Sequence, residues 1–382
     1  MTMAADKQDK VLNVPTLRFP EFTDEWELHP TTDFFEFKNG LNPDSKRFGS
    51  GTKFISVMDI LNNRYITYDK IKAFVEPKGN DLNEFGVNYG DVLFQRSSET
   101  LEDVGRANVY LDKKTALFGG FVIRGKKIGE YNPLFFRYLL SSPHARKRIV
   151  VKGAGAQHFN IGQDGLSKIS IFVPTTKEQE RIAKLLDLID ERIETQNRII
   201  DKLQSLMKGL AEHLTAFTPN IKITDCLNCH SSILQENQVK DEGKYKVYGA
   251  NGICGYNDSP AILEDAILIV KDGSGVGNVS YASGEYSVIG TSNYLTAKSG
   301  YSLKYLYYCL MIFNFVPYRT GMAIPHIYFK DYGKALIPCP SLDKQEQIAT
   351  LLSKIECKIE AEKTITDSYL QQKRFLLNSM FI

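Results

Sequence analysis

The chain lacks the sequence signals of a membrane or exported protein. No uninterrupted apolar stretch of about 18 residues occurs, so a membrane-spanning helix is not expected. The first ten residues are polar and charged, with no apolar core like that of a secretory signal. The six cysteines are scattered over 382 residues and are interpreted as reduced thiols. We therefore expect a cytoplasmic protein without a membrane partner.

Excess charge of one sign is absent too, since 47 Lys and Arg residues nearly balance 45 Asp and Glu residues and leave a net charge of +2. A nucleic-acid-binding role would have to come from local placement of basic side chains rather than from bulk basicity. With 43% hydrophobic and 24% charged residues, the composition is that of an ordinary globular protein. The length exceeds the size at which one core keeps growing, so two or more domains are expected.

Catalytic signatures are also missing. The sequence has no Gly-x-x-x-x-Gly-Lys-Ser/Thr phosphate loop, no Gly-x-Ser-x-Gly nucleophile elbow and no His-Glu-x-x-His zinc motif. A self-contained enzyme is therefore not expected, and no catalytic residue is assigned. The histidines are too dispersed to suggest a general base with an orienting carboxylate; they are His29, His144, His158, His213, His230 and His326.

A glycine-rich segment, 272–278, resembles a nucleotide-binding loop but departs from its pattern. Asn278 stands where a dinucleotide-binding loop needs its third glycine. The residues that follow, 279–282, have the pattern of a strand, so no helix N-terminus would face a phosphate. We expect instead a glycine hairpin that lets the backbone approach a ligand closely.

A Cys-x-x-Cys-His segment offers a second incomplete motif. Cys226, Cys229 and His230 have the spacing of a haem-attachment site, and with Cys254 they could offer zinc ligands. The chain has no export signal and no second paired-cysteine element. We therefore expect buried or surface thiols near a domain edge, and no metal site is assigned.

What the chain does contain is a duplicated helix. The segment KEQERIAKLL at 177–186 returns as DKQEQIATLL at 343–352, about 166 residues later. A proline precedes each copy, at Pro174 and Pro340, and the apolar frame then stays in step for roughly thirty residues. A period this long indicates two whole domain-plus-helix units rather than a solenoid, whose repeats run about 20 to 50 residues.

Both copies carry the heptad pattern of a coiled-coil seam. In the first copy the pattern runs over about 177–216, which predicts a helix of roughly 60 Å at about 1.5 Å per residue. The second copy is apolar in its first half and less regular in its second half. The predicted helix-pair seam consists of Ile182, Leu186, Ile189, Ile193, Gln196, Ile200 and Leu203 in the first helix and Ile348, Leu352, Ile355, Ile359 and Glu362 in the second.

Polar Gln196 falls opposite polar Glu362 when the two seams are aligned, and a polar seam position is a means of fixing helix register. We therefore predict that the two helices pair with each other in antiparallel orientation. The alternative is two amphipathic helices that pack separately, each on its own domain core.

The residues before the first helix, and those between the helices, change to short runs rich in Val, Ile, Phe and Tyr. Gly, Asn and Asp separate these runs, as they separate strands in a mixed α+β domain. A helix is predicted in each unit, at 133–140 and 303–311. The predicted strands include 53–58, 91–94, 118–123, 169–173, 266–270, 286–289 and 335–339.

The two units match each other inside the domains as well. Segments 90–97 and 264–271 correspond, and each leads to a Val-Gly step that is followed by Arg106 or Asn278. The two units therefore share a fold while their polar residues differ. This difference is what two readers of different ligands on one scaffold would show.

The start of the chain completes the pattern. Residues 13–22, NVPTLRFPEF, come before Glu25 and Trp26, and both long helices begin with a strand-Pro-x-x-x-x-Gln-Glu segment at 173–180 and 339–346. In these features the whole chain resembles the DNA specificity subunit of a type I restriction-modification enzyme. The second unit lacks the Phe-Pro-Glu-Phe and Trp lead-in, and only a loose counterpart precedes it.

The resemblance implies an α+β fold with two tandem-repeated mixed α/β target recognition domains and two long helices forming an antiparallel coiled coil. It implies recognition domains at 1–172 and 218–338, a central spacer helix at 173–217 and a C-terminal spacer helix at 339–382. Each domain would read one half of a bipartite site on double-stranded DNA, and the helices would set the spacing.

The resemblance also implies partners. The helices would bind two methylation subunits, and restriction subunits would join through them. S-adenosylmethionine would be bound by the methylation subunits, with no cofactor or metal in this chain.

DNA recognition needs Lys and Arg for phosphates, and polar side chains presented to base edges from glycine-hinged loops. For each candidate taken alone, ordinary surface solvation is as good an interpretation as DNA contact. The candidates are Arg96, Ser97, Arg106, Gln157, His158 and Asn160 in the first unit and Lys271, Ser274, Asn278, His326 and Tyr328 in the second.

Two other functions are weighed against this one. The chain could be a metal-dependent DNA endonuclease that uses Asp44, although no Glu-x-Lys follows on a nearby strand and a turn is the better interpretation of 42–46. It could also be a coiled-coil scaffold whose globular ends bind proteins.

Overall fold

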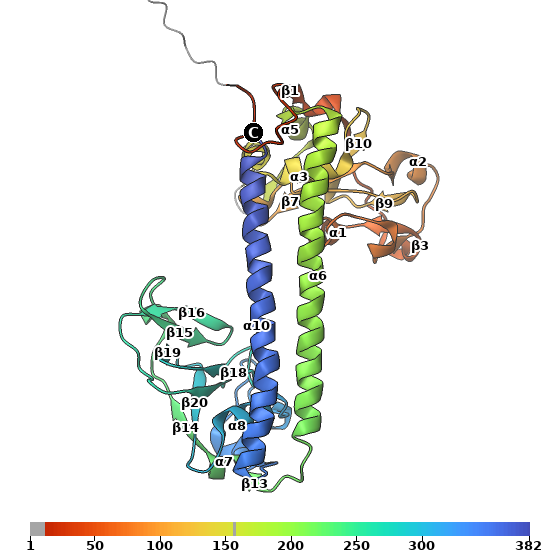
Figure 1. Cartoon of the computed structure of the whole chain (residues 1–382). Helices are drawn as coiled ribbons and strands as arrows, with labels where there is room; N and C mark the ends of the chain where they lie inside the picture. The colour runs from red at the N-terminus through yellow and green to blue at the C-terminus, as the bar shows by residue number, and fades with distance from the viewer. Residues whose placement is uncertain (1–11, 156–157) are drawn as a thin grey trace, which may run out of the picture. The chain divides into compact units, whose positions relative to one another are not determined.

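The computed structural model describes residues 12–155 and 158–382, which form two compact units (Figure 1). Unit 1 comprises Met1–Thr195 and Ile365–Ile382, and unit 2 comprises Gln196–Thr364. Two long helices, α6 (Thr176–Leu214) and α10 (Leu342–Ser379), each contribute one part to each unit. The last residues of the chain therefore belong to the first unit.

Unit 1 is built on a four-stranded antiparallel sheet covered by helix α3 (Pro133–Ser141). The side chain of Asn132 caps this helix by accepting a hydrogen bond from the backbone N–H of Phe135 at 3.0 Å. Phe135 is fully buried in a core that also contains Phe35 and Phe94 of the sheet. The strands, in spatial order, are β2 (Phe35–Asn39), β10 (Val122–Lys127), β6 (Val92–Gln95) and β8 (Ala107–Val109).

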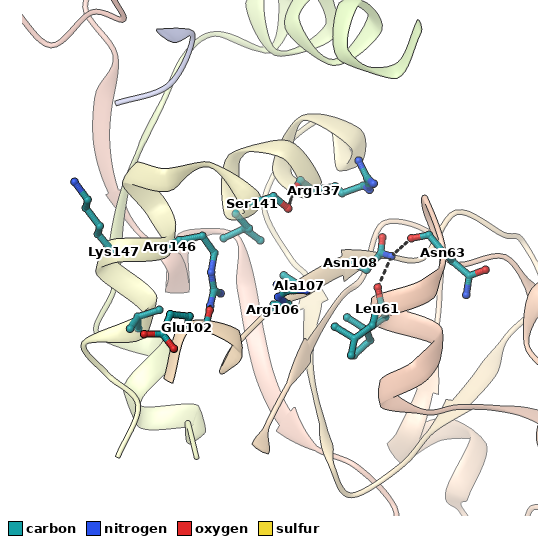
Figure 2. A pocket seen from close by; sticks show the side chains of 13 residues that line it. Leu61, Asn63, Glu102, Arg106, Ala107, Asn108, Arg137, Ser141, Arg146 and Lys147 are labelled. Atoms are coloured by element: carbon teal, nitrogen blue, oxygen red, sulfur yellow. Dashed lines mark hydrogen bonds between the residues drawn. The ribbon is translucent and has the colours of Figure 1, made fainter. Parts of the chain in front are cut away.

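A second sheet of unit 1 packs against the first through a shared apolar cluster that joins Leu93 to Ile55 and Phe118. The buried Asn108 side chain donates hydrogen bonds to the carbonyls of Ile60 and Asn63 and so fastens a short helix to the edge of the first sheet (Figure 2). The second sheet has the order β4 (Phe74–Val75), β3 (Phe48–Ile55), β9 (Ala116–Phe118) and β5 (Gly86–Val87), with β3 and β9 parallel.

The remaining elements of unit 1 are short. They are α1 (Val57–Asn62), α2 (Asp81–Phe85), β7 (Ser97–Ser98), α4 (Pro143–Val150), β11 (Phe159–Asn160) and α5 (Gln163–Ser167), together with the antiparallel pair β1 (Glu27–Pro30) and β12 (Ser170–Val173).

Unit 2 repeats this design. Its helix α8 (Leu303–Met311) corresponds to α3, and its main sheet has the order β14 (Leu227–Ser231), β20 (Ser292–Ala297), β17 (Ala266–Val270) and β18 (Val279–Ala282). The second sheet, in the order β16 (Gly252–Asn257), β15 (Tyr245–Gly249) and β19 (Tyr286–Val288), again contains one parallel pair. The pair β13 (Ile221–Lys222) and β21 (Leu336–Ile337) corresponds to β1 and β12, and the short helices are α7 (Ile223–Cys226) and α9 (Phe329–Tyr332).

Two strand predictions were wrong in detail. The predicted strand 53–58 ends at Ile55, because Ser56 and Asp59 form a capping box that starts α1. The predicted run 118–123 is two strands, since a turn closed by a 2.9 Å bond from the N–H of Val122 to the carbonyl of Gly119 separates β9 from β10. In both places a local side-chain or glycine effect interrupts an apolar run.

The glutamine of the repeated helix start has the same structural role in both units. The side chain of Gln179 accepts a hydrogen bond from the N–H of Asn132 and donates one to the carbonyl of Pro174, both at 2.9 Å. Gln345 makes the matching bonds to Ser302 at 3.0 Å and to Pro340 at 2.8 Å. The motif therefore ties the start of each long helix to the start of α3 or α8.

The two long helices pair within each unit, as predicted. In unit 1, the Nζ atom of Lys373 on α10 lies 2.5 Å from Oδ1 of Asp190 on α6. In unit 2, Gln196 donates a hydrogen bond of 2.6 Å to Glu362. Ala211, later on α6, shares a core with Ile348, earlier on α10, so the helices run antiparallel. The helices pair and also belong to the domain cores.

Every predicted seam position is buried or half-buried, which is consistent with the heptad pattern. In unit 1 these positions are Ile182, Leu186, Ile189 and Ile193; in unit 2 they are Gln196, Ile200, Leu203, Ile348, Leu352, Ile355, Ile359 and Glu362.

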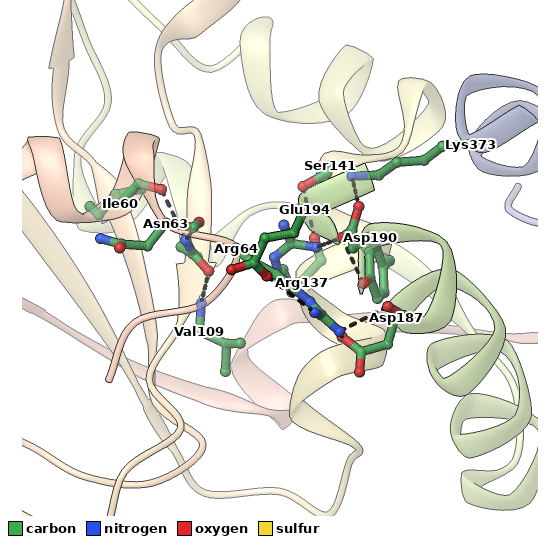
Figure 3. Close-up of polar contacts among 12 residues, drawn as sticks. Ile60, Asn63, Arg64, Val109, Arg137, Ser141, Asp187, Asp190, Glu194 and Lys373 are labelled. Atoms are coloured by element: carbon green, nitrogen blue, oxygen red, sulfur yellow. Dashed lines mark hydrogen bonds and ion pairs between the residues drawn. The ribbon is translucent and has the colours of Figure 1, made fainter. Parts of the chain in front are cut away.

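A buried carboxylate anchors α6 in unit 1 (Figure 3). Asp190 accepts hydrogen bonds from Tyr138 at 2.9 Å and Arg137 at 3.1 Å on α3, and it pairs with Lys373. Burial alone would raise the pKa of Asp190, but the charges of Arg137 and Lys373 outweigh it and hold the pKa below its ordinary value of 3.8. In unit 2, Glu356 takes the corresponding place and accepts from Tyr308 at 3.0 Å.

We predict that Asp190→Asn lowers the free energy of unfolding of unit 1 by roughly 3 kcal/mol at neutral pH, because it leaves two half-buried cations without their buried counterion. Ionised Asp190 stabilises the fold above its ordinary pKa, and this contribution disappears as the pH falls through the lowered value. The free energy of unfolding of the wild type should therefore fall below about pH 4. That of the variant should depend less on pH in this range. Urea titration followed by fluorescence of Trp26, the single tryptophan and a core residue of unit 1, measures both effects.

The matched control is Glu191→Gln, which removes a charge from the exposed neighbouring position. Its unfolding midpoint should stay close to that of the wild type. Equal midpoints for the two variants would contradict an anchoring role for Asp190.

Candidate nucleic-acid interface

Two loops of unit 1 meet beyond the end of β6. Strand β7 pairs with β11, so that Ser97 lies opposite Asn160, and the Ser97 hydroxyl donates a 2.5 Å hydrogen bond to Oδ1 of Asn160. The N–H of Ile161 donates to the carbonyl of Arg96 at 2.9 Å. Three predicted residues are thereby brought together, with the exposed His158 beside them.

Unit 2 builds the same arrangement from different residues. The N–H of Ile327 donates to the carbonyl of Lys271 at 2.9 Å, which matches the bond between Ile161 and Arg96. His326 then lies next to this loop, and its ring contacts that of Tyr328 with centroids 5.0 Å apart. The predicted residues Lys271, His326 and Tyr328 therefore form a second cluster on an equivalent backbone.

The Val-Gly step supports each cluster from a neighbouring turn. Gly105 has a φ of 68° and Gly277 a φ of 88°, a region that favours glycine. A Cβ atom on Gly105 would lie 2.6 Å from the side chain of Ile149, and one on Gly277 would lie 3.0 Å from Phe315. The backbone of the following residue, Arg106 or Asn278, pairs with the end of β6 or β17.

The remaining candidates lie on these Val-Gly loops or outside the described residues. Arg106 is exposed and pairs with Asp103 at 2.6 Å, while Ser274 and Asn278 are exposed on the glycine-rich turn that joins β17 to β18. This turn is the predicted hairpin. Gln157 falls outside the part of the chain that the structure describes.

An apolar surface next to Arg96 was missed by the sequence analysis. A cavity of about 400 Å³ opens there, and Phe121 at its edge is 70% exposed. The backbone N–H of Arg96 donates to the carbonyl of Phe121 at 2.9 Å, so the two residues are neighbours. A phenylalanine within an apolar run gives no sign in the sequence that it faces outward.

The structure separates the residues of the Cys-x-x-Cys-His segment from Cys254. Cys226 is buried in the core of unit 2, and burial raises the pKa of its thiol to about 12 and that of Cys229 to about 11. Cys254 lies in the other sheet. Within residues 12–155 and 158–382, no group of three His, Cys, Asp or Glu side chains could hold a metal ion.

Two further sequence expectations concern a turn and the absence of a membrane span. The backbone carbonyl of Asp44 accepts from the N–H of Arg47 at 2.9 Å, so 42–46 lead into a turn. No helix in the described part of the chain combines the length and the apolar character that crossing a membrane would require.

Comparison with known proteins identifies the family. The family model described as "Type I restriction modification DNA specificity domain" matches residues 23–205 and 220–368. These two matches cover most of the chain. The chain therefore belongs to the type I restriction-modification DNA specificity family and carries two specificity domains.

Two specificity subunits are among the relatives, one matched over nearly its whole length and one over part of it. A putative type I restriction enzyme specificity subunit, MjaX, from Methanocaldococcus jannaschii is 22% identical over 402 residues, covering 94% of this chain and 93% of the relative. The EcoKI specificity subunit from Escherichia coli is 24% identical over 185 residues, covering 47% of this chain and 39% of the relative. The crystal structure of the S subunit from M. genitalium has a TM-score of 0.62 at 17% identity and covers 97% of this chain and 99% of that chain, which shows a shared fold.

We predict that Gly105→Ala destabilises unit 1 by about 2 kcal/mol, because an alanine is strained at this positive φ and its methyl group meets Ile149. Urea titration, monitored by Trp26 fluorescence, measures the change in the free energy of unfolding. Gly162→Ala is the control, since a Cβ at Gly162 meets nothing within 4 Å. A Gly105→Ala protein as stable as this control would contradict the close packing described for the Val-Gly step.

Proposed function

We propose that the chain is the non-catalytic reader of a bipartite, asymmetric DNA site. One observation carries the proposal: the two units present loop clusters with the same backbone hydrogen bonds and different side chains. Ile161 bonds to Arg96 in one cluster and Ile327 bonds to Lys271 in the other. Membership of the DNA specificity family supports DNA as the ligand.

The side chains of the two clusters suit different base edges. Arginine and lysine recognise the two acceptors of guanine in the major groove, and asparagine recognises adenine with its paired donor and acceptor. Unit 1 offers Arg96 and Asn160, whereas unit 2 offers Lys271 and His326. The two half-sites should therefore differ in sequence.

A methyl-bearing base would suit the apolar surface of unit 1. Phe121, exposed beside Arg96, is placed to contact a thymine methyl group at a base pair next to the one that Arg96 reads. Unit 1 would then combine polar and apolar base recognition.

The long helices suit a partner-binding role. They lie within the predicted spacer segments 173–217 and 339–382, and exposed apolar side chains such as Leu188 at 52% and Phe375 at 60% remain on their surfaces. We propose that they bind two methylation subunits, through which restriction subunits join. Those methylation subunits would bind S-adenosylmethionine and extrude the target adenine, in the cytoplasm.

We predict that Asn160→Ser changes recognition of only one half-site, and that His326→Gln changes only the other. Each loss of a base contact should reduce discrimination at its position by about tenfold or more. Mapping methylated adenines across the host genome, with each variant in place of the wild-type gene, gives the recognised sequence directly.

Lys113→Gln, an exposed charge change outside both clusters, should leave the methylated sequence unaltered. A single variant that rewrote both half-sites would rule out the division of labour between the units. Methylation that did not depend on this gene at all would rule out the proposed function itself.

A further inference from the structure

A basic cavity opens in unit 1 beside the Val-Gly loop (Figure 2). Its volume is about 580 Å³, and helix α4 and the loop before β8 form two of its walls. The charged residues that line it are four cations and one carboxylate; they are Arg106, Arg137, Arg146, Lys147 and Glu102.

Arg146 is held in place with part of its guanidinium unused. Its Nη2 donates to the carbonyl of Glu102 at 2.8 Å and to that of Val104 at 2.6 Å. Its Nη1 is enclosed and has no hydrogen-bond partner among the described residues. Burial and then the like charge of Arg106 lower the pKa of Arg146 to about 10, so the two cations lie close enough to repel each other.

The other charges around the cavity are partly compensated. Arg137 is committed to Asp190 at 3.1 Å, so it contributes little to an added anion. Arg106 pairs with Asp103 at 2.6 Å, but with Arg106 54% exposed such a surface pair is weak and its remaining donors are free to bind. Lys147 is exposed in the last turn of α4, and its side chain points away from Arg106 (Figure 2).

Unit 2 shows which of these features belong to the shared scaffold. There, Arg319 donates to the carbonyl of Val276 at 2.8 Å, as Arg146 does to Val104. The residue after the Val-Gly step, however, is Asn278 instead of Arg106, and the residue after Arg319 is Thr320 instead of a lysine. The carbonyl-binding arginine is therefore structural in both units, and the two additional cations are particular to unit 1.

We propose that this cavity binds one phosphodiester group of the DNA backbone, with Arg106 as its main ligand and Nη1 of Arg146 as a buried donor. The proposal rests on the proposed function. An exposed guanidinium and an unpaired buried donor at one cavity suit an anion with several acceptor oxygens.

The position of the cavity favours a DNA phosphate over a free anion. The N–H of Gln95 donates to the carbonyl of Arg106 at 2.8 Å, so the cavity adjoins the end of β6, which Arg96 and Ser97 follow. A phosphate bound there would fix the register in which that loop meets the bases. Phosphate contacts position a protein on DNA, while base contacts specify the sequence.

The test compares the full-length chain with Arg106→Gln, Arg106→Ser and the control Lys113→Gln by fluorescence anisotropy. Each protein is titrated with a duplex that contains its methylation site and with a scrambled duplex, at several salt concentrations. The two cavity variants should weaken binding to both duplexes by the same factor, roughly tenfold. The slope of log Kd against log salt concentration should fall by about one for each variant, while the control keeps the wild-type slope.

Further measurements distinguish a DNA phosphate site from a small-anion site and from a base-reading site. Arg106→Lys should restore the salt slope, because it keeps the charge, and an unchanged Trp26 unfolding midpoint shows that each variant is folded. If inorganic phosphate raises the unfolding midpoint of the wild type while the variants bind DNA normally, the cavity is a small-anion site and the proposal is overturned. Loss of preference between the two duplexes would overturn it as well, because the residues would then read bases.

The phosphate assignment and the proposed function fail in different ways. A wild-type protein that prefers its own site, together with cavity variants of unchanged affinity and slope, would overturn only the phosphate assignment. A wild-type protein with no preference for its site would overturn the proposed function and this assignment with it.

Discussion

The structure depends on the completion of the unit 1 core by the end of the chain. The ring of Phe381 contacts that of Trp26 edge-on, with centroids 6.2 Å apart. Its centroid lies 5.6 Å from that of the Phe135 ring on α3. Met380 is buried in the same cluster as Ile182 of α6. Helix α10 therefore contributes residues to the core of unit 2 near its start and to the core of unit 1 near its end.

The duplication separates a constant scaffold from variable surfaces. Gln179 and Gln345 tie the helix starts in the same way, and Tyr138 and Tyr308 hold the corresponding carboxylates. The residues that differ lie where the loops meet and at the turn after the Val-Gly step. A protein that must read two unlike half-sites from one fold needs this separation of scaffold and ligand contacts.

The segment before unit 1, which contains Arg18 and Trp26, contacts a carboxylate that unit 2 lacks. Arg18 makes two 2.7 Å hydrogen bonds to the buried carboxylate of Glu178, and Trp26 donates a third at 3.3 Å. The corresponding position in the second long helix is Lys344, which could not accept these bonds. The missing Trp lead-in and the missing carboxylate thus occur together in unit 2.

Much of the fold could be predicted because the relevant signals are local and repeated. The heptads, the glutamine helix starts and the Val-Gly steps each recur in the sequence, and each recurrence marks a matching element. The errors at 53–58 and 118–123 arose where a capping box and a glycine turn broke an apolar run. The basic cavity could not be predicted, because Arg106 and Arg146 are distant in sequence and each alone is typical of a solvated surface residue.

Truncation of the chain after Thr364 tests the central claim most directly, since it removes the part of α10 that belongs to unit 1. The measurement is urea unfolding followed by Trp26 fluorescence. We expect the truncated protein to unfold at a clearly lower urea concentration, with Trp26 more exposed to water even before denaturation. An unfolding midpoint and emission spectrum equal to those of the full chain would contradict the dependence of unit 1 on the end of the chain.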